Sequence, residues 1–254
     1  ATVFPQTMLV DYVRVYQRGP DDSEDEVVFD ENTMATGQWI TIDIPLAALD
    51  SLVTRGHIGQ IVLSGDLQTV YVDNVFFHQP ATSPVAAAPT PAYPAGDVIS
   101  LFSNAYAGVP VDTWSAVWDN ADVSDTLAAG DEIKRYDNLV FAGVEFTSTP
   151  INASSMTHFR IDVWTPDPTA FPTQFKIKLV DFGADGVYSP GVDDVEHELA
   201  FDASTTPGLI SGSWITFDIP LNDFTSLVTT SHLAQLIISG DITTVIVDNV
   251  LFHR

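Results

Sequence analysis

The sequence predicts an all-β protein built as an antiparallel β-sandwich of jelly-roll type. Short segments rich in β-branched and aromatic residues recur along the chain, and Pro, Gly, Asp or Asn bounds each of them. Several segments alternate apolar and polar residues, and none shows a long helical period. We expect about nine strands in the second part of the chain, which suits two antiparallel sheets packed face to face.

The expected strands follow one another towards the C-terminus. They are HFRIDVW (158–164), QFKIKLVDF (174–182), WITFDIPL (214–221), LAQLIISG (233–240) and TVIVDNVLF (244–252). Alternation in the first strand separates Phe159, Ile161 and Val163 from an opposite face that holds Arg160, Asp162 and Trp164. In the second strand, Lys176 and Lys178 lie opposite Phe175, Ile177 and Leu179. Residues 221–230 can form at most a turn or two of helix.

The charge of the chain restricts its partners. Its 254 residues include 34 acidic and 9 basic side chains, a net charge of −25. Such a field repels nucleic acid and anionic membrane surfaces, so neither is an expected partner. Two interpretations stay open, a soluble secreted protein and an adaptation to high salt, where counterions screen the repulsion. The absence of cysteine excludes disulfides, thiolate metal sites and thiol catalysis.

A linker divides the chain. The stretch QPATSPVAAAPTPAYPAG (79–96) has five prolines and no charged residue, a composition that favours an extended, semi-stiff spacer. We therefore predict a linker at residues 80–96 between an N-terminal part, residues 1–79, and a C-terminal part, residues 97–254.

An internal repeat brackets this linker. Residues 39–78 align without gaps with residues 214–253, and 24 of the 40 positions are identical. The match extends upstream through DDSEDEVVFD (21–30) against DDVEHELAFD (193–202), and reaches LVDY (9–12) against LVDF (179–182). The repeat predicts one complete module at residues 97–254 and the C-terminal half of another in residues 1–79.

Two resemblances suggest where these parts come from. TMLVDYVRVYQ (7–17) resembles the C-terminal strand of glycoside hydrolase family 16 enzymes of the laminarinase and agarase type. The module resembles the β-sandwich carbohydrate-binding modules, family 4-like with a galactose-binding-like fold, that such marine enzymes carry. The segments that carry this likeness are VDTWSAVWD (111–119), FAGVEF (141–146), MTHFRIDVWTPD (156–167), LVDFGADG (179–186), WITFDIPL (214–221) and VDNVLFH (247–253).

The resemblance implies a secreted, non-catalytic module that attaches a hydrolase to polysaccharide, with β-1,3-glucan (laminarin) or a related algal glycan as the target. The chain is expected to be a fragment of a longer product. A deletion at the tetrapeptide shared by LVDY and LVDF would join the end of an enzyme to half a module.

Catalysis is not expected. Family 16 hydrolases place their carboxylates as E-x-D-x-E or E-x-D-x-x-E on one strand, and neither spacing occurs. Glu196 and Glu198 share a strand face with His197 between them, which indicates a solvated surface. No G-x-S-x-G nucleophile signature and no H-x-x-x-H pair is present.

Sugar binding requires aromatic faces for stacking and polar groups for the hydroxyls. The expected site joins Trp164 with Arg160 and Asp162, and adds Lys176 and Lys178 from a neighbouring strand. A salt-bridged face with a partly buried tryptophan explains the trio equally well. Trp114 and Trp118 lie four residues apart and would point the same way in a strand; they form a platform, a core pair or a plug in a loop. Trp214 recurs as Trp39, which favours a core anchor.

Calcium is the expected ion. By resemblance to related modules, a structural calcium would lie at Asp248 with Asn104 as a further ligand. The loop DFGADGVYSPGVDD (181–194) also concentrates carboxylates, but turn chemistry explains it as well.

The half-module leaves an open apolar face and unpaired edges, so we also expect that it forms a homodimer. The alternative to glycan binding is a structural or adhesion sandwich whose half-module mediates self-association.

Overall fold

A computed structural model describes residues 12–17, 23–30, 34, 36–52, 55–66, 69–79, 81–189 and 191–254. The chain divides into two compact units, unit 1 (Ala1–Phe77) and unit 2 (His78–Arg254). Among the described residues, no helix has the length and apolar character needed to cross a membrane.

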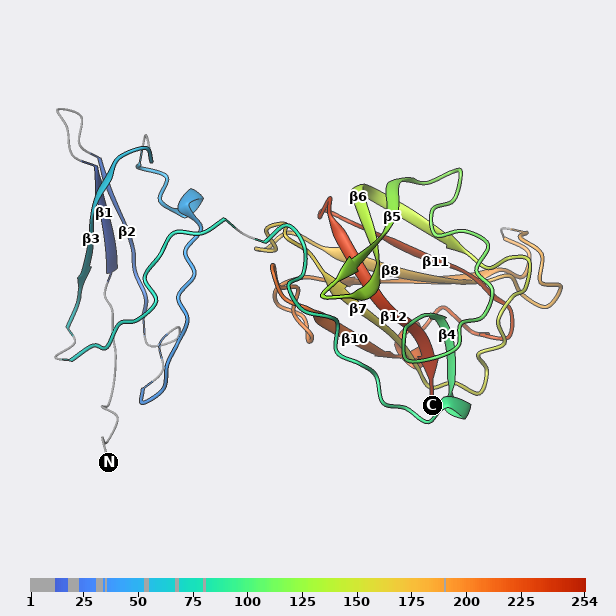
Figure 1. The fold of residues 1–254 in the computed structure, drawn as a ribbon. Helices are drawn as coiled ribbons and strands as arrows, with labels where there is room; N and C mark the ends of the chain where they lie inside the picture. Colours follow the sequence, from blue (N-terminus) through green and yellow to red (C-terminus); the bar gives the residue numbers. More distant parts are fainter. Residues whose placement is uncertain are drawn as a thin grey trace. The chain divides into compact units, whose positions relative to one another are not determined.

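Unit 2 is an antiparallel β-sandwich (Figure 1). Its nine strands are β4 (Val98–Phe102), β5 (Asn120–Ala128), β6 (Asp131–Glu145), β7 (His158–Trp164), β8 (Phe175–Asp181), β9 (Val195–Phe201), β10 (Ile215–Pro220), β11 (Leu233–Gly240) and β12 (Val245–His253). They form one continuous sheet in the order β10-β7-β12-β6-β11-β8-β9, with β4 beside β12 and β5 beside β6. The predicted fold class and the five predicted strands are confirmed. Residues 221–230 hold only a 3-10 turn, η3 (Leu221–Asp223).

Strand β6 connects the two layers of the sandwich. Its first part pairs with β5 and with the start of β12, at Val245–Val247. Its last part, Phe141–Glu145, pairs with β11 instead. Asn138 lies between the two parts with a φ of 52°, in the left-handed region that interrupts a regular strand. One layer therefore contains β10, β7, β12, β4 and β5, and the other contains β11, β8 and β9.

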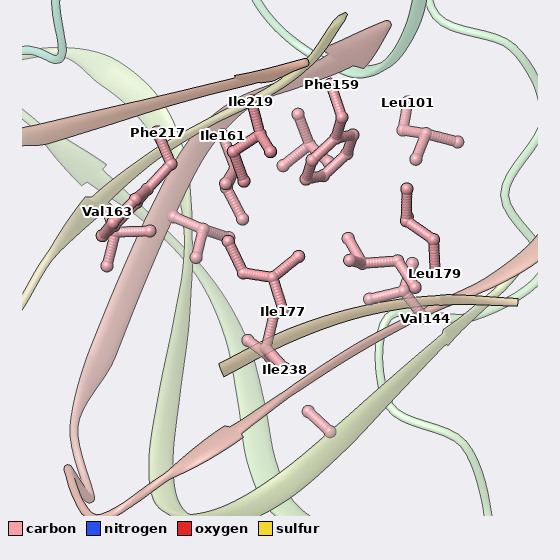
Figure 2. Packing of buried hydrophobic residues seen from close by; sticks show 14 of the residues in the cluster. Leu101, Val144, Phe159, Ile161, Val163, Ile177, Leu179, Phe217, Ile219 and Ile238 are labelled. Carbon is pink, nitrogen blue, oxygen red and sulfur yellow. The ribbon is translucent and has the colours of Figure 1, made fainter. Parts of the chain in front are cut away.

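The core lies between these layers. Phe159, Ile161 and Val163 of β7 face Ile177 and Leu179 of β8, as Figure 2 shows, and all five are fully buried. The alternation predicted for both strands is confirmed, so the intervening residues of β7 and β8 lie on the two outer faces. Burying each such side chain contributes about 1.5–3 kcal/mol relative to its exposure.

The proline-rich segment lies against unit 2. We call residues 81–97, which end in the 3-10 turn η2 (Ala95–Asp97), the strap. Side chains of unit 2 donate hydrogen bonds to its carbonyls along its length: Arg135 to Thr82 (2.8 Å), Trp214 to Ala86 (2.8 Å) and Arg160 to Pro89 (2.9 Å). These hydrogen bonds hold the segment against the sandwich.

Unit 1 contains a smaller antiparallel sheet with the order β2-β1-β3, formed by β1 (Tyr12–Gln17), β2 (Glu24–Val27) and β3 (Ile58–Ser64). A 3-10 turn, η1 (Leu46–Ala48), lies between β2 and β3. The hydrolase-like stretch 7–17 is a strand over its described part, and residues 7–11 lie outside the described residues.

Candidate functional site

The seven predicted sugar-binding residues lie at three separate places in unit 2. Arg160, Asp162 and Trp164 project from the outer face of β7, whereas Lys176 and Lys178 project from the outer face of β8, on the opposite side of the sandwich. The two tryptophans of VDTWSAVWD lie in the loop before β5 and point in different directions. The structure therefore does not assemble these residues into one site.

Arg160 and Asp162 form a buried ion pair beneath the strap. The Arg160 guanidinium donates to both carboxylate oxygens, at 3.1 and 2.8 Å. Thr216 and Asn249 also donate to Asp162, at 2.6 and 2.8 Å, and the Asp162 side chain is fully buried. Burial lowers the pKa of Arg160, but hydrogen bonds to Asp162 and Tyr93 raise it above its ordinary value. The predicted hydroxyl-binding role is wrong for this pair, because its hydrogen bonds are used within the fold and anchor the strap.

Trp164 is part of the interior. Only 2% of it is exposed, and it packs with Ala128, Ile133 and Ile246. Trp214 packs against this cluster and donates its indole N–H to the strap. The prediction that Trp164 stacks on sugar is therefore corrected, and Trp214 anchors local packing as expected.

Trp114 and Trp118 have different surroundings because their loop does not continue as a strand. Trp114 packs against the core, with Phe102 edge-on at 5.6 Å and the Lys134 ammonium 5.1 Å from its ring centre. Trp118 is 43% exposed. The strand that would make both rings point the same way is not formed, and of the two rings only Trp118 offers a face to solvent.

The Trp118 ring lies on the backbone of β6. A Cβ atom at Gly143 would come within 2.3 Å of the indole, so the absence of a side chain there lets the ring lie against the strand. Phe141 stacks beside it, with ring centres 6.1 Å apart and an angle of 17° between the planes. The Trp118 Nε1–H donates to Glu145 Oε1 (3.1 Å), and this contact fixes the in-plane orientation of the ring.

Polar side chains continue outward from this ring across the sheet. Gln235 on β11 donates to the same Glu145 oxygen (3.0 Å). Strand register places Gly143 beside Ile237, and Ile237 beside Lys178, so the indole and the Lys178 side chain share one face about 10 Å apart at the usual strand spacing. We define the Trp118 face by its exposed and half-buried members and by Gln235: Trp118, Phe141, Glu145, Lys176, Lys178, Glu196, Glu198, Gln235, Ile237 and Ser239.

The lysines of this face are paired with acidic residues of β9. Lys178 lies 3.1 Å from Glu196, and Lys176 lies 3.4 Å from Glu198. Glu145 adds one further carboxylate to the face. Among the ion pairs of the described residues, none joins Glu145 to a lysine. The face thus has almost no net charge in a chain that is strongly acidic overall.

Sequence reasoning missed Phe141, Gly143, Glu145 and Gln235. The signal was present in FAGVEF (141–146), where alternation places Phe, Gly and Glu on one side and Ala142, Val144 and Phe146 on the other. The location of Trp118 over the glycine was not readable, because a loop delivers it from residues far from β6 in sequence.

The acidic loop 181–194 follows turn chemistry. Asp181 accepts backbone N–H groups from Gly183 and His232, Asp193 accepts from Ala184, and Asp194 accepts from Ser189. Asp185 accepts from Val187. Each carboxylate therefore satisfies a backbone donor within or beside the loop.

The predicted calcium ligands lie beside a third residue, Asp131. The Asn104 amide contacts Asp131 Oδ1, and Asp248 is buried in β12 with Asp131 and Asp162 as neighbours. Burial raises the pKa of Asp248 to about 7; the Asn249 N–H opposes this rise, and the two acidic neighbours add to it. The described residues contain no group of three or more His, Cys, Asp or Glu side chains suited to a metal ion. The oxygen donors present are therefore two carboxylates and one amide.

Comparison with known proteins identifies similar solved structures only. No family model and no curated protein matches the sequence. The family 30 carbohydrate-binding module of a cellulosomal cellulase from Clostridium thermocellum is 14% identical, with a TM-score of 0.45, over 61% of this chain and 96% of that one. A family 11 module from a cellulosomal cellulase of the same organism is 12% identical, with a TM-score of 0.39, over 61% and 94% of the chains. A family 28 module described as specific for non-crystalline cellulose is 17% identical, with a TM-score of 0.39, over 55% and 87%.

Proposed function

We propose that unit 2 is a non-catalytic carbohydrate-binding module that holds a polysaccharide on the Trp118 face. The observation that carries this proposal is the flat, 43% exposed indole of Trp118, held against Gly143 and oriented by Glu145. The C–H face of a pyranose ring stacks on such a surface without a large conformational cost, because the ring is already fixed.

The groups around the indole suit sugar hydroxyls. Glu145 accepts two hydrogen bonds from its neighbours, and its position beside the ring offers a charged acceptor to a stacked sugar. Lys178 and Glu196 continue this polar surface along the sheet, where they would contact further residues of a chain. An open sheet face suits an extended polymer better than a small molecule enclosed in a cavity.

Charge favours a neutral glycan. Both lysines of the face are neutralised by glutamates, and the rest of the chain repels anions. A sulfated or carboxylated polysaccharide would have to approach without a compensating cation. We propose a neutral β-glucan such as laminarin, bound outside the cell, where the module targets a glycoside hydrolase to its substrate.

We also propose calcium at Asp248, Asp131 and Asn104, where it would stabilise the fold without touching the glycan. A hard divalent cation prefers such oxygen donors. It would offset the repulsion from Asp131 and Asp162, which adds to the effect of burial in raising the pKa of Asp248. The expected result is a higher unfolding temperature in calcium than in chelator, and no such difference for Asp248→Asn. Equal temperatures in both buffers for the unsubstituted chain would contradict this assignment.

The test of binding is affinity electrophoresis of the full chain in gels that contain laminarin, mixed-linkage glucan, agarose or a sulfated galactan. We expect retardation by a neutral glucan and at least a tenfold loss of affinity in Trp118→Ala, since a stacked ring contributes about 1.4 kcal/mol. Phe171→Ala is the matched control, because Phe171 is an exposed aromatic residue on a loop of the same unit.

The arms of this test separate function from specificity. Retardation by the sulfated galactan alone would leave a binding module with the wrong proposed ligand. Equal mobility in every gel, or equal loss in Trp118→Ala and Phe171→Ala, would overturn the binding site itself.

A further inference from the structure

Unit 1 exposes apolar residues whose sequence counterparts form the core of unit 2. Residues 39–78 align with residues 214–253. Seven apolar residues of unit 1 in this alignment are 37–63% exposed, whereas their counterparts in unit 2 are at most 1% exposed. The exposed members are Ile61, Leu63, Val70, Tyr71, Val72, Val75 and Phe77, and their counterparts are Leu236, Ile238, Val245, Ile246, Val247, Val250 and Phe252.

Unit 2 shows what covers these positions when the module is complete. Strand β12 lies between β7 and β6 and also pairs with β4. All of its residues are buried, with Val245 and Val247 in the main core and Ile246 in a second cluster. Strand β11 presents Leu236 and Ile238 to the opposite layer. In the described part of unit 1, residues 69–79 belong to no strand, and β3 pairs with β1 alone.

The exposed apolar residues of unit 1 belong to two faces of the repeat. The counterparts of six of the seven lie in the main core of unit 2, whereas Ile246, the counterpart of Tyr71, lies in a separate cluster against which Trp214, the counterpart of Trp39, packs. Over the two faces, the seven residues and Trp39 expose roughly 900 Å² of mostly apolar area in total, and a standard interface buries about 800 Å² on each partner. Burial of these faces against another protein is therefore expected to be favourable.

We propose that unit 1 of a second copy of the chain covers this surface, so that two half-modules form one dimeric sandwich. A second copy carries the same apolar residues at the same concentration, and a two-fold arrangement buries both surfaces at once. Face-to-face packing of two three-stranded sheets reproduces the two-layer architecture that unit 2 achieves within one chain. This dimer is independent of glycan binding, which uses the other unit.

Net charge gives the dimer a distinctive salt dependence. Each copy carries −25, so two copies repel one another at low ionic strength. Salt screens that repulsion, and it also strengthens apolar association when the anion is sulfate. The dimer is therefore expected to be tighter at about 1 M salt than at about 0.05 M salt.

The experiment is sedimentation equilibrium of the full chain over a wide concentration range, at low and high salt. We expect a monomer–dimer equilibrium that shifts towards dimer with concentration and salt. Val72→Asp and Ile61→Asp should each weaken dimerisation at least tenfold, because each places a charge on the buried surface. Val72→Thr, which keeps the shape of the side chain, should have a smaller effect.

Val187→Asp and Val192→Asp are the matched controls, since both valines are exposed on a loop of unit 2. They add the same charge and should leave the equilibrium unchanged. The chain has no cysteine, so Leu63→Cys gives a single reporter that should be protected from alkylation at concentrations where the dimer forms, whereas Val192→Cys should react at every concentration.

A monomer mass at every concentration and salt would overturn the proposal. The same conclusion would follow if Val72→Asp and Val187→Asp weakened dimerisation equally. A monomer in which Leu63→Cys is protected from alkylation would mean that another part of the same chain covers the surface, and it would also overturn the dimer.

Discussion

Residues 39–78 and 214–253 are close copies in sequence, but only the second copy forms strands at both ends. Residues 215–220 and 245–253 are β10 and β12, whereas residues 39–45 and 69–79 have no regular secondary structure. The middle of each copy does form a strand, β3 in the first and β11 in the second. The difference lies in the neighbours: β10 pairs with β7, and β12 pairs with β4, β6 and β7.

The alignment of residues 9–78 with unit 2 covers the region from the end of β8 onward, so these residues contain no counterpart of β4 to β7. What remains is equivalent to one part of one layer. Strands β2 and β3 correspond to β9 and β11, and the order β2-β1-β3 matches β9-β8-β11. The hydrolase-like strand β1 takes the place of β8. A strand sequence thus needs a partner strand before its backbone donors and acceptors are satisfied as a strand.

Local features survive in both copies without those partners. Asn74 and Asn249 have φ values of 53° and 49°, and the backbone N–H of each contacts the preceding aspartate. A 3-10 turn after a proline occurs in each copy, at η1 and η3. Leu49 and Leu52 are buried in a small cluster, and their counterparts Phe224 and Leu227 are buried in the main core of unit 2. Short-range chemistry is therefore the same in both.

The largest expected effect separates two equivalent phenylalanines. Phe252→Ala should destabilise unit 2 by about 3–5 kcal/mol, because it leaves a cavity in a closed core. Phe77→Ala, at the aligned position, should cost less than about 1 kcal/mol in dilute solution, because Phe77 is 56% exposed. Urea unfolding followed by circular dichroism measures both. Similar costs for the two substitutions would contradict the burial difference.

A smaller difference in the free energy of unfolding is expected between the aligned asparagines, Asn74 and Asn249. Asn249→Ala removes the hydrogen bond to buried Asp162 and strains a left-handed backbone, which together cost about 2–4 kcal/mol. Asn74→Ala keeps only the backbone strain, about 1–2 kcal/mol. Glycine at either position removes the strain, so Asn74→Gly should be nearly neutral while Asn249→Gly remains destabilising. Equal values for the two glycine variants would show that the Asp162 contact contributes nothing.

The smallest expected effect concerns pH. The Ser51 backbone N–H donates to Asp25 (2.8 Å) and holds the pKa of that carboxyl below its ordinary value. In unit 2, the equivalent N–H of Ser226 donates to His197 instead (3.1 Å). The pKa of Asp25 is lower in the folded state than in the unfolded state. Its contribution to the stability of unit 1 is therefore fully present above the unfolded pKa and is lost as pH falls through the folded pKa.

Nuclear magnetic resonance titration of Asp25 should therefore give a pKa below that of an unstructured aspartate. Asp25→Asn should remove the corresponding slight acid dependence of unit 1 stability, and Asp43→Asn on the same unit serves as the comparison. An ordinary pKa for Asp25 would show that the Ser51 contact is not formed in solution.

Strand prediction succeeded in unit 2 because alternation reports burial directly. Phe159, Ile161 and Val163 face the core as their spacing indicates. The same alternation could not show that the opposite face of β7 is covered, because the strap that covers Arg160 and Asp162 comes from a proline-rich segment about 70 residues upstream. At Trp118 the sequence could not show which face stays open, because the ring lies on Gly143 of β6 while Trp118 itself comes from a loop.

The amino-acid sequence by itself determined the period of each strand, the turns, the left-handed asparagines and the repeat, because these depend on residues a few positions apart. Tertiary structure decided which face of the sandwich stays open to a ligand and which copy of the repeat becomes a buried strand. Those outcomes depend on strands and loops distant in sequence that supply hydrogen-bond partners and exclude water. Two similar segments therefore share their turns and left-handed asparagines, but only the one with β4, β6 and β7 beside it has a closed core.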